Sequence, residues 1–358
     1  MKNNINISIG TDIGGQGGVS TVLQTYKECG FFDSNNVVHI ATHVKGNGAI
    51  KLLRYLSSLF KLTFLSVTNN VGVYHIHMSS KASYYRKSLL VRLIKFLGGK
   101  VILHLHGAEF REFYARECDR NRKKHLDATF EMSDVVIVLS SQWIEWAKST
   151  FNRTEHFKLL YNAVPSVEQT TIRSPSPTIC FLGRVGHRKG VNDLFRALVK
   201  VKEQCPDVRL LIGGDGDIEK YRAITKDFGI ECYVEFLGWV SGQRKSDLLS
   251  QSHIYCLPSY NEGFPMGVLE AMSAGTAVVS TYAGGIPDAI HSGKEGFLVE
   301  PGDSDALADA LIRLLTEPET SRTFTDNAKS KFDARFSVDA IIPQLQAIYD
   351  ELQDERCC

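Results

Sequence analysis

The sequence predicts an α/β protein with two Rossmann-like domains, and three observations lead to this prediction. Short apolar runs alternate with amphipathic stretches along the chain, a pattern typical of βα units around parallel sheets. The chain has 358 residues, more than one hydrophobic core usually serves. A stretch rich in Pro, Ser and Thr interrupts the alternation near the middle. We therefore predict a first domain over residues 1–165, a linker over 166–177 and a second domain over 178–336, facing each other across a central cleft.

In the first domain, six apolar runs are expected to form strands and five amphipathic stretches are expected to form the helices between them. The strands are expected at Ile5–Ile9, Val37–Ile40, Val73–Ile76, Val101–Leu105, Val135–Leu139 and Phe157–Leu160. The helices are expected at Gly18–Cys29, Ala49–Leu65, Ala82–Leu97, Glu117–Met132 and Gln142–Thr150.

The same alternation begins again at Thr178. Strands are expected at Thr178–Leu182, Val208–Gly213, Val234–Leu237, Ile254–Leu257, Ala277–Ser280 and Gly296–Val299. Helices are expected at Val191–Gln204, Ile218–Phe228, Ser241–Ser250, Gly267–Ser273, Ile286–Ile290 and Asp303–Leu315. The amphipathic stretch Ser337–Leu352 predicts a last helix that packs back on the first domain.

Composition and cysteine use favour a cytoplasmic protein. Hydrophobic residues make up 43% and charged residues 23% of the chain, and no run of 18 apolar residues predicts a membrane span. The N-terminus runs directly into Ile5–Ile9, so we expect no signal peptide. The eight cysteines form no zinc-type pattern and are expected to be reduced thiols. Cys357 and Cys358 could accept a lipid, but a frayed tail is the simpler interpretation.

Charge is unevenly distributed. The net charge of +1 combines +9 over residues 1–165 with −8 over the remainder, and no acidic residue occurs between Asp33 and Glu109. The ten cations of this interval are Lys45, Lys51, Arg54, Lys61, Lys81, Arg86, Lys87, Arg92, Lys95 and Lys100. Such a domain favours an anionic partner. The stretch Lys81–Lys100, with six cations among apolar residues, predicts either a helix lying on an anionic membrane or a buried helix with a solvated basic edge.

Two acidic residues, Glu262 and Glu270, frame a Gly/Pro-containing loop that leads into a helix rich in small residues. The N-terminus of such a helix offers free N–H groups to an anion or to sugar hydroxyls. A carboxylate further along can accept hydrogen bonds from a ribose diol. A solvated pair of glutamates is the alternative. The small residues favour the binding interpretation, because they allow a ligand to approach the backbone.

Arg184 and Lys189 lie in a glycine-bearing loop between a strand that ends at Leu182 and the next helix. A diphosphate needs cations at such a junction, where Arg provides a planar fork and Lys a point charge. The alternative is an ordinary basic surface loop.

Glycines follow several other strands. Gly14-Gly15-Gln16-Gly17-Gly18 has the position of a phosphate loop but matches neither the Walker pattern nor G-x-G-x-x-G. Gly213-Gly214-Asp215-Gly216 predicts a tight turn, and Gly284-Gly285-Ile286-Pro287 a turn into a helix. His104 and His106 lie at the end of the expected strand Val101–Leu105, where one of them could face the cleft.

Taken together, these motifs resemble the GT-B fold retaining glycosyltransferases of glycosyltransferase family 4, also called glycosyl transferases group 1. The resemblance covers nearly the whole chain and is strongest over residues 178–315. It depends on Gly14-Gly15-x-Gly17-Gly18, Phe181-Leu182-Gly183-Arg184, Lys189-Gly190, Gly213-Gly214-Asp215-Gly216, Phe236-Leu237-Gly238, Pro258-Ser259, Glu262-x7-Glu270 and Gly284-Gly285-x-Pro287. His187 and Arg188 depart from it, since many relatives have Glu or Pro there.

The resemblance implies roles for these residues. Arg184 and Lys189 would neutralise the donor diphosphate, Glu262 would lie near the donor sugar, and His106 would lie beside the transferring sugar. Glu270 would bind the ribose. The remaining residues expected to contact the donor, through phosphate, sugar or base, are Gly17, Gly18, Gly183, Gly214, Gly238, Val240, Gly263, Phe264, Pro265, Met266, Gly267, Val268 and Leu269.

The resemblance further implies a retaining hexosyltransferase that moves a sugar from a nucleotide-diphosphate donor, with a UDP-sugar favoured over GDP-mannose. The acceptor would be a saccharide or a polyprenyl-diphosphate-linked saccharide, in bacterial O-antigen, lipopolysaccharide, capsule or exopolysaccharide synthesis. We expect no cofactor, no metal and no nucleic acid, and a location in the cytoplasm, in part on the inner face of the membrane. A non-catalytic sugar-nucleotide binder and a nucleic-acid-binding protein are the alternatives. A nicotinamide oxidoreductase is disfavoured because G-x-G-x-x-G is absent.

Overall fold

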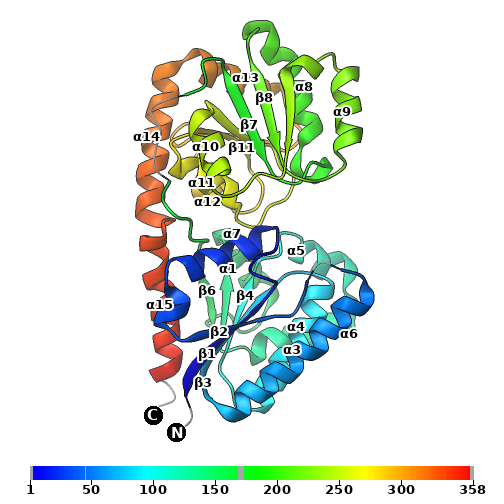
Figure 1. The fold of residues 1–358 in the computed structure, drawn as a ribbon, viewed down its shortest axis with the longest axis vertical. Coiled ribbons are helices and arrows are strands. Elements are labelled where there is room, and N and C mark those ends of the chain that lie inside the picture. The colour runs from blue at the N-terminus through cyan, green and yellow to red at the C-terminus, as the bar shows by residue number, and fades with distance from the viewer. Residues whose placement is uncertain (1–2, 45, 168–172, 355–358) are drawn as a thin grey trace. The chain divides into compact units, whose positions relative to one another are not determined.

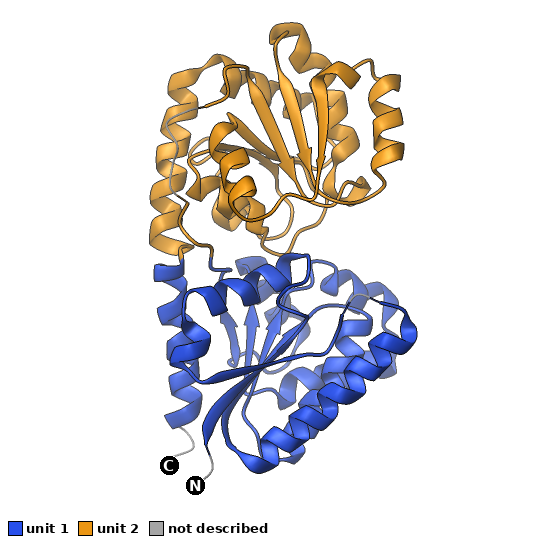
Figure 2. Cartoon of the chain, in the orientation of Figure 1, with its two compact units in different colours: residues 1–163, 338–358 blue, residues 164–337 orange. Residues whose placement is uncertain are grey.

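The computed structural model describes residues 3–44, 46–167 and 173–354, and the chain forms two compact units (Figures 1 and 2). The first domain comprises residues 1–163 and 338–358, and the second comprises 164–337. The predictions for Lys45, for residues 168–172 of the expected linker and for Cys357 and Cys358 lie outside the described residues.

The first domain contains a six-stranded parallel sheet in the order β2-β1-β3-β4-β5-β6. Its strands are β1 (Asn4–Gly10), β2 (Val37–Ala41), β3 (Asn70–Met78), β4 (Val101–Leu105), β5 (Val135–Val138) and β6 (Phe157–Leu159). Its helices are α1 (Gly18–Glu28), α2 (Phe31–Ser34), α3 (Gly48–Thr68), α4 (Ala82–Phe96), α5 (Phe110–Glu112), the π-helical turn η1 (Phe113–Glu117), α6 (Arg120–Met132), α7 (Ser141–Thr150) and α15 (Val338–Asp354). Most strand residues are buried, including several polar residues and histidines, because helices cover both faces of such a sheet.

The second domain contains a parallel sheet in the order β12-β11-β10-β7-β8-β9, the strand order of a Rossmann fold. Its strands are β7 (Thr178–Leu182), β8 (Arg209–Gly213), β9 (Val234–Gly238), β10 (Ile254–Leu257), β11 (Ala277–Thr281) and β12 (Phe297–Val299). Its helices are the short 3-10 turns η2 (His187–Lys189) and η3 (Glu231–Tyr233), with α8 (Val191–Gln204), α9 (Ile218–Asp227), α10 (Gln243–Gln251), α11 (Met266–Ser273), α12 (Ile286–Ala289), α13 (Ser304–Thr316) and α14 (Pro318–Arg335). The predicted α/β class with two Rossmann-like domains is confirmed.

The last helix, α15, packs on the first domain, as expected. Tyr349 is buried, shares a hydrogen bond of 3.0 Å with His75 of β3 and meets the ring of Phe31 edge-on at 5.1 Å. Lys158, which follows the start of β6, forms an ion pair with Glu351. The chain therefore returns to its first domain after the second is complete (Figure 2).

One long helix was not predicted. The stretch Pro318–Arg335 is polar, but its buried residues Phe324, Ala328 and Phe332 recur every four positions and form one narrow apolar stripe. Pro318 at the first helical position suits a helix start, because the amide it lacks would have no partner there.

The apolar residues of the basic stretch Lys81–Lys100 divide between the core and the surface, so membrane binding by this stretch stays a prediction. Tyr84, Leu90 and Ile94 of α4 are buried, whereas Leu89 and Phe96 are 51% and 87% exposed. Exposed apolar side chains are more numerous on α3: Ile50, Leu52, Leu53, Leu56, Phe60, Phe64 and Val67. Over the residues that the structure describes, we find no helix whose length and hydropathy would suit a membrane span.

Candidate active site

The strand order of the second domain places two of the predicted motifs side by side. In this topology the ligand crevice lies at the carboxyl ends of the strands where the order reverses, here between β7 and β10. The loop after β7 contains Arg184 and Lys189, and the loop after β10 contains Glu262. Two loops that are far apart in the sequence therefore meet at one edge of the sheet.

Lys189 and Glu262 form a partly enclosed ion pair. The Lys189 Nζ lies 2.5 Å from Glu262 Oε1, and the two side chains are 15% and 7% exposed. The hydroxyl of buried Ser259 donates to the same oxygen at 2.6 Å. Arg184 is exposed and has no ion-pair partner among the described residues. The site thus presents a fixed ammonium group and a guanidinium group that is free to bind an anion.

Backbone contacts hold these loops together. Arg188 Nη1 donates to Asn261 O at 2.9 Å, and Tyr260 N donates to Arg188 O at 2.9 Å. Gly190 has a φ of +69°, and a Cβ there would overlap the carbonyl oxygen of Pro258. A Cβ at Gly284, where φ is +56°, would likewise overlap the carbonyl oxygen of Glu262. These two glycines are required because neither position has room for a side chain.

The glycines after β7, β8 and β9 connect the ends of those strands. Gly183 N donates to Gly213 O at 2.9 Å, and Gly214 N donates to Gly238 O at 2.7 Å. Val240 is buried beside Gly213, where a Cβ would meet its side chain. These bonds hold the ends of the three strands together, and the glycines there leave the backbone open to a ligand.

Glu270 lies in α11, one helix turn beyond the loop, and is 8% exposed. Its Oε1 lies 2.6 Å from the Nζ of Lys245, in the first turn of α10. The sequence analysis did not identify Lys245, because it is one cation in a polar helix and belongs to none of the motifs. Its pairing gives the mostly buried Glu270 carboxylate a charge partner.

The N-terminus of α11 follows Pro265, and no side chain caps it. Phe264, Val268 and Leu269 are buried, so they can reach a ligand only through their backbone. Val268 N already donates to Pro265 O at 3.2 Å. The amides of Gly263, Phe264, Met266 and Gly267 are therefore better placed than those of Val268 and Leu269 to bind an anion or sugar hydroxyls, whereas Pro265 has no N–H to donate.

Gly17, Gly18 and His106 belong to the first domain. Gly17 precedes α1 with a φ of +118°, and a Cβ at Gly17 or Gly18 would meet no atom within 4 Å. This loop follows β1 and therefore lies at the β1/β3 reversal of the first sheet. An open glycine loop at a reversal point suits a ligand, and donor contact by Gly17 and Gly18 stays a prediction.

His106 follows β4 and belongs to a stack of histidines. Its Nε2 lies 2.9 Å from His77 Nδ1, and its ring lies 4.1 Å from that of His104. Burial, reinforced by the nearby Lys87, lowers the pKa of His106 to about 3. The imidazole is therefore neutral at pH 7 and can donate or accept a hydrogen bond.

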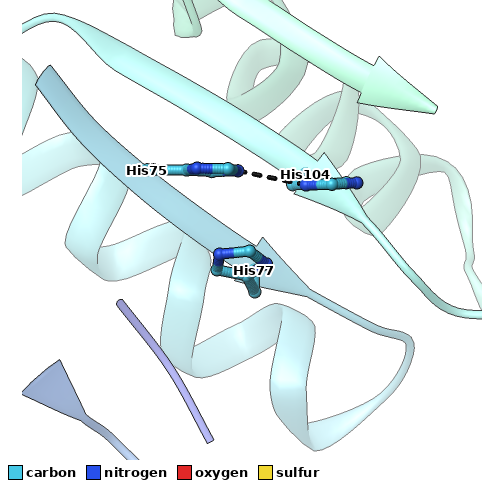
Figure 3. Close-up of side chains that lie close together, drawn as sticks. All are labelled: His75, His77 and His104. Atoms are coloured by element: carbon cyan, nitrogen blue, oxygen red, sulfur yellow. Dashed lines mark hydrogen bonds between the residues drawn. The ribbon is translucent and has the colours of Figure 1, made fainter. Parts of the chain in front are cut away.

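Beneath His106 lie His75, His77 and His104, on the adjacent strands β3 and β4 (Figure 3). One nitrogen from each ring lies within 4.8 Å of the others, so the group has the geometry for a metal ion. His75 Nε2 and His104 Nδ1 already share a hydrogen bond of 3.0 Å. The expectation that sugar transfer needs no metal remains a prediction.

Comparison with known proteins agrees with this fold and these motifs. Residues 165–331 match the family model of glycosyl transferases group 1. The N-acetyl-alpha-D-glucosaminyl L-malate synthase of Bacillus anthracis is 26% identical over 83% of this chain and 79% of that protein. The phosphatidyl-myo-inositol mannosyltransferase of Mycobacterium leprae is 35% identical over 48% of this chain and 46% of its own length.

Solved structures share the fold over almost the entire chain. Sucrose-phosphate synthase from Thermosynechococcus elongatus superposes with a TM-score of 0.81 at 19% identity, covering 98% of this chain and 99% of that one. The Anabaena protein HepE, in complex with UDP-glucose, gives a TM-score of 0.77 at 19% identity, covering 97% and 100%. The family model and the relatives place residues 165–331, nearly half of the chain, with glycosyl transferases group 1, and the solved structures share the fold of almost the entire chain.

Proposed function

We propose that this enzyme transfers a hexose from a nucleotide-diphosphate sugar to a saccharide or lipid-linked saccharide acceptor, with retention of the anomeric configuration. The observation that carries the proposal is the Lys189–Glu262 pair beside the unpaired Arg184 at the β7/β10 reversal. A UDP-sugar is the favoured donor, because the HepE structure contains UDP-glucose, and GDP-mannose comes next. Bacterial surface polysaccharide synthesis is the proposed setting.

In this mechanism the bond between the anomeric carbon and the diphosphate oxygen breaks first, and positive charge develops on the sugar. Arg184 and Lys189 stabilise the two phosphates as they take over the bonding electrons. The acceptor hydroxyl attacks the same face of the sugar, and its proton passes to a phosphate oxygen. Glu262 holds Lys189 in place and lies where the sugar would bind, so it orients both.

Nucleotide binding is the direct test. The full-length protein is heated with UDP, GDP, ADP or TDP, each with and without EDTA, and its melting temperature is recorded. A ligand that binds only the native state raises this temperature. We expect the largest rise with UDP and no effect of EDTA. No rise with any nucleotide would contradict the proposal, and the anomeric configuration of the product, measured by NMR, tests retention.

We further propose that α3 places the enzyme on an anionic membrane. Leu53, Leu56, Phe60, Phe64 and Val67 recur every three or four residues, so they share one face of α3, and each is at least 51% exposed. The helix also contains Lys51, Arg54 and Lys61 and no acidic residue. An exposed apolar face with cations is typical of interfacial helices, and anionic lipid is the occupant that satisfies both features.

Vesicle co-sedimentation tests this surface. The protein is expected to bind vesicles that contain phosphatidylglycerol and to bind pure phosphatidylcholine weakly. The double change of Phe60 and Phe64 to Ser should weaken binding about tenfold or more, since each buried ring contributes roughly 1.5–3 kcal/mol. Tyr282→Ser, at an exposed aromatic residue of the second domain, is the control. Failure to bind anionic vesicles, with dimerisation through α3 instead, would reject the membrane assignment.

A further inference from the structure

A group of basic side chains lies at the carboxyl edge of the first sheet. His43 follows the end of β2, and His106 follows β4. Arg86 and Lys87 lie in α4, the helix after β3. Because all strands of this sheet are parallel, their carboxyl ends meet at one edge, and the order reverses there between β1 and β3. The group therefore occupies the position where open α/β sheets bind ligands.

Of the four cations of α4, Lys87 is buried and Arg86 is partly buried. Lys87 is only 3% exposed, and Arg86 Nε is completely buried without a hydrogen-bond partner. The backbone carbonyl of Arg86 accepts a hydrogen bond of 2.9 Å from Tyr55 of α3, which fixes this turn of α4. Among the described residues, no carboxylate forms an ion pair with Arg86, Lys87 or His43. A buried charge without a partner is costly, so its retention requires a reason.

Burial and nearby cations disfavour the charged forms of Lys87, His43 and His106. Burial, followed by the charge of Arg86, lowers the pKa of Lys87 to about 7. Burial lowers the pKa of His43, and the charges of Arg86, Lys51 and Lys87 lower it further. Lys87 also acts on His106. Without a ligand the site holds positive charge at a cost, and a bound anion would remove that cost.

We propose that Lys87, Arg86 and His43 bind a phosphate or diphosphate group of the acceptor, next to His106. The inference deepens the proposed function and rests on it. Arg86 provides a planar guanidinium with several N–H donors, and Lys87 provides a compact ammonium group. This combination suits an anion with several oxygens. The donor diphosphate is assigned to Arg184 and Lys189 of the second domain, so this is a second anion. The acceptor is accordingly a phosphorylated compound.

Inorganic pyrophosphate is the probe, titrated by calorimetry into the full-length protein with saturating UDP, which occupies the donor diphosphate site. We expect saturable binding of pyrophosphate under these conditions. Lys87→Met should weaken it by about tenfold to a hundredfold, the usual effect of losing one charge-assisted bond. Lys124→Met, at an exposed cation of the adjacent helix α6, should leave it unchanged. Absence of pyrophosphate binding, or equal binding by Lys87→Met, would overturn the proposal.

Stability separates a binding role from a structural one. Lys87→Met removes an uncompensated buried charge, so the ligand-free variant should melt at or above the temperature of the wild type while it binds pyrophosphate less well. A lower melting temperature together with unchanged pyrophosphate binding would show that Lys87 is structural. UDP affinity, measured on the same variant, should not change. If the wild type itself does not bind UDP, the result would count against the proposed function.

Two further ligands distinguish the sources of the phosphate. A soluble hexose 1-phosphate is titrated as above, and phosphatidylcholine vesicles are prepared with and without a polyprenyl diphosphate. Preference for the hexose phosphate indicates a soluble acceptor, and preference for the loaded vesicles a lipid-linked one. In either case Lys87→Met should raise the acceptor KM more than it lowers kcat. Equal KM values in Lys87→Met and wild type would contradict the assignment.

Discussion

Acidification from pH 7 to pH 5.5 is expected to lower the unfolding free energy of the first domain, because three buried histidines are neutral in the folded state and become protonated on unfolding. His75, His77 and His104 are 1%, 2% and 0% exposed. Burial lowers the pKa of all three, to about 3 for His75 and well below 6.5 for the other two, and the neighbouring histidines lower it further. The native state therefore holds all three as neutral rings at pH 7.

The groups around the three histidine rings do not offset the lowering of their pKa. The groups that face the three rings from other elements are Tyr26 of α1, His39 of β2, His106 after β4 and Tyr349 of α15. None of them carries a negative charge at pH 7. No described carboxylate contributes to the pKa of any of the three rings, so none offsets a new positive charge.

The direction follows from proton linkage. A histidine in the unfolded chain titrates near 6.5, whereas these three titrate lower in the folded state, so the unfolded chain binds more protons below pH 6.5. The free energy of unfolding is unaffected above that range and decreases as the pH falls. Between pH 7 and pH 5.5 each histidine costs about 1.3 kcal/mol, or about 4 kcal/mol for the three. A typical domain is stable by roughly 5–15 kcal/mol, so the loss is large.

Tryptophan fluorescence can follow the two domains separately. Trp143 and Trp146 belong to the first domain and Trp239 to the second, so in Trp239→Phe the signal reports on the first domain alone. Urea unfolding at the two pH values gives the change in free energy. Adding His104→Asn, which keeps a polar group near His75 but does not titrate, should reduce that change by about a third. An unfolding free energy equal at pH 7 and pH 5.5 would refute the reasoning.

Two further predictions concern residues of the second domain. Replacing Arg184 and Lys189 together by Ala should lower kcat/KM at least about a hundredfold, since each charge-assisted bond contributes roughly 1.5–3 kcal/mol; steady-state transfer assays measure this, and unchanged turnover would exclude both residues from the site. Gly284→Ala should cost about 2 kcal/mol or more and most of the activity, because its Cβ would overlap the carbonyl oxygen of Glu262. Gly293→Ala has a similar positive φ in open space and should cost only about 1 kcal/mol. Equal urea midpoints for the two variants would contradict this explanation.

Much of the fold could be predicted from local pattern. All twelve strands lie where apolar runs predicted them, and α8 matches its expected bounds, Val191–Gln204. The prediction missed α14, whose apolar stripe is one residue per turn in a polar sequence. It did not settle which apolar side chains of α4 and α3 face solvent, because an apolar side chain appears identical in the sequence whether it faces a sheet or solvent.

Of the residues in the candidate site, some could be predicted from the sequence and others could not. Arg184, Lys189, Glu262 and Glu270 could be found because glycines and a helix start mark their loops. Lys245 and Lys87 could not be predicted, because a lone lysine in a helix carries no local signal. Lys245 is distinguished only by its ion pair with Glu270, and Lys87 only by its burial.

The sequence alone determined the class of the protein, its parallel sheets and the loops with chemistry, since these depend on short-range periodicity and on turn residues. The tertiary structure decided which of these groups meet. Lys189 reaches Glu262 only because the strand order brings β7 beside β10. In the same way, the histidines of β3 and β4 stack, and Lys87 is enclosed, through the packing of strands and helices that lie far apart in the chain. Burial and charge pairing depend on neighbours in space, and for that reason they became visible only in the folded molecule.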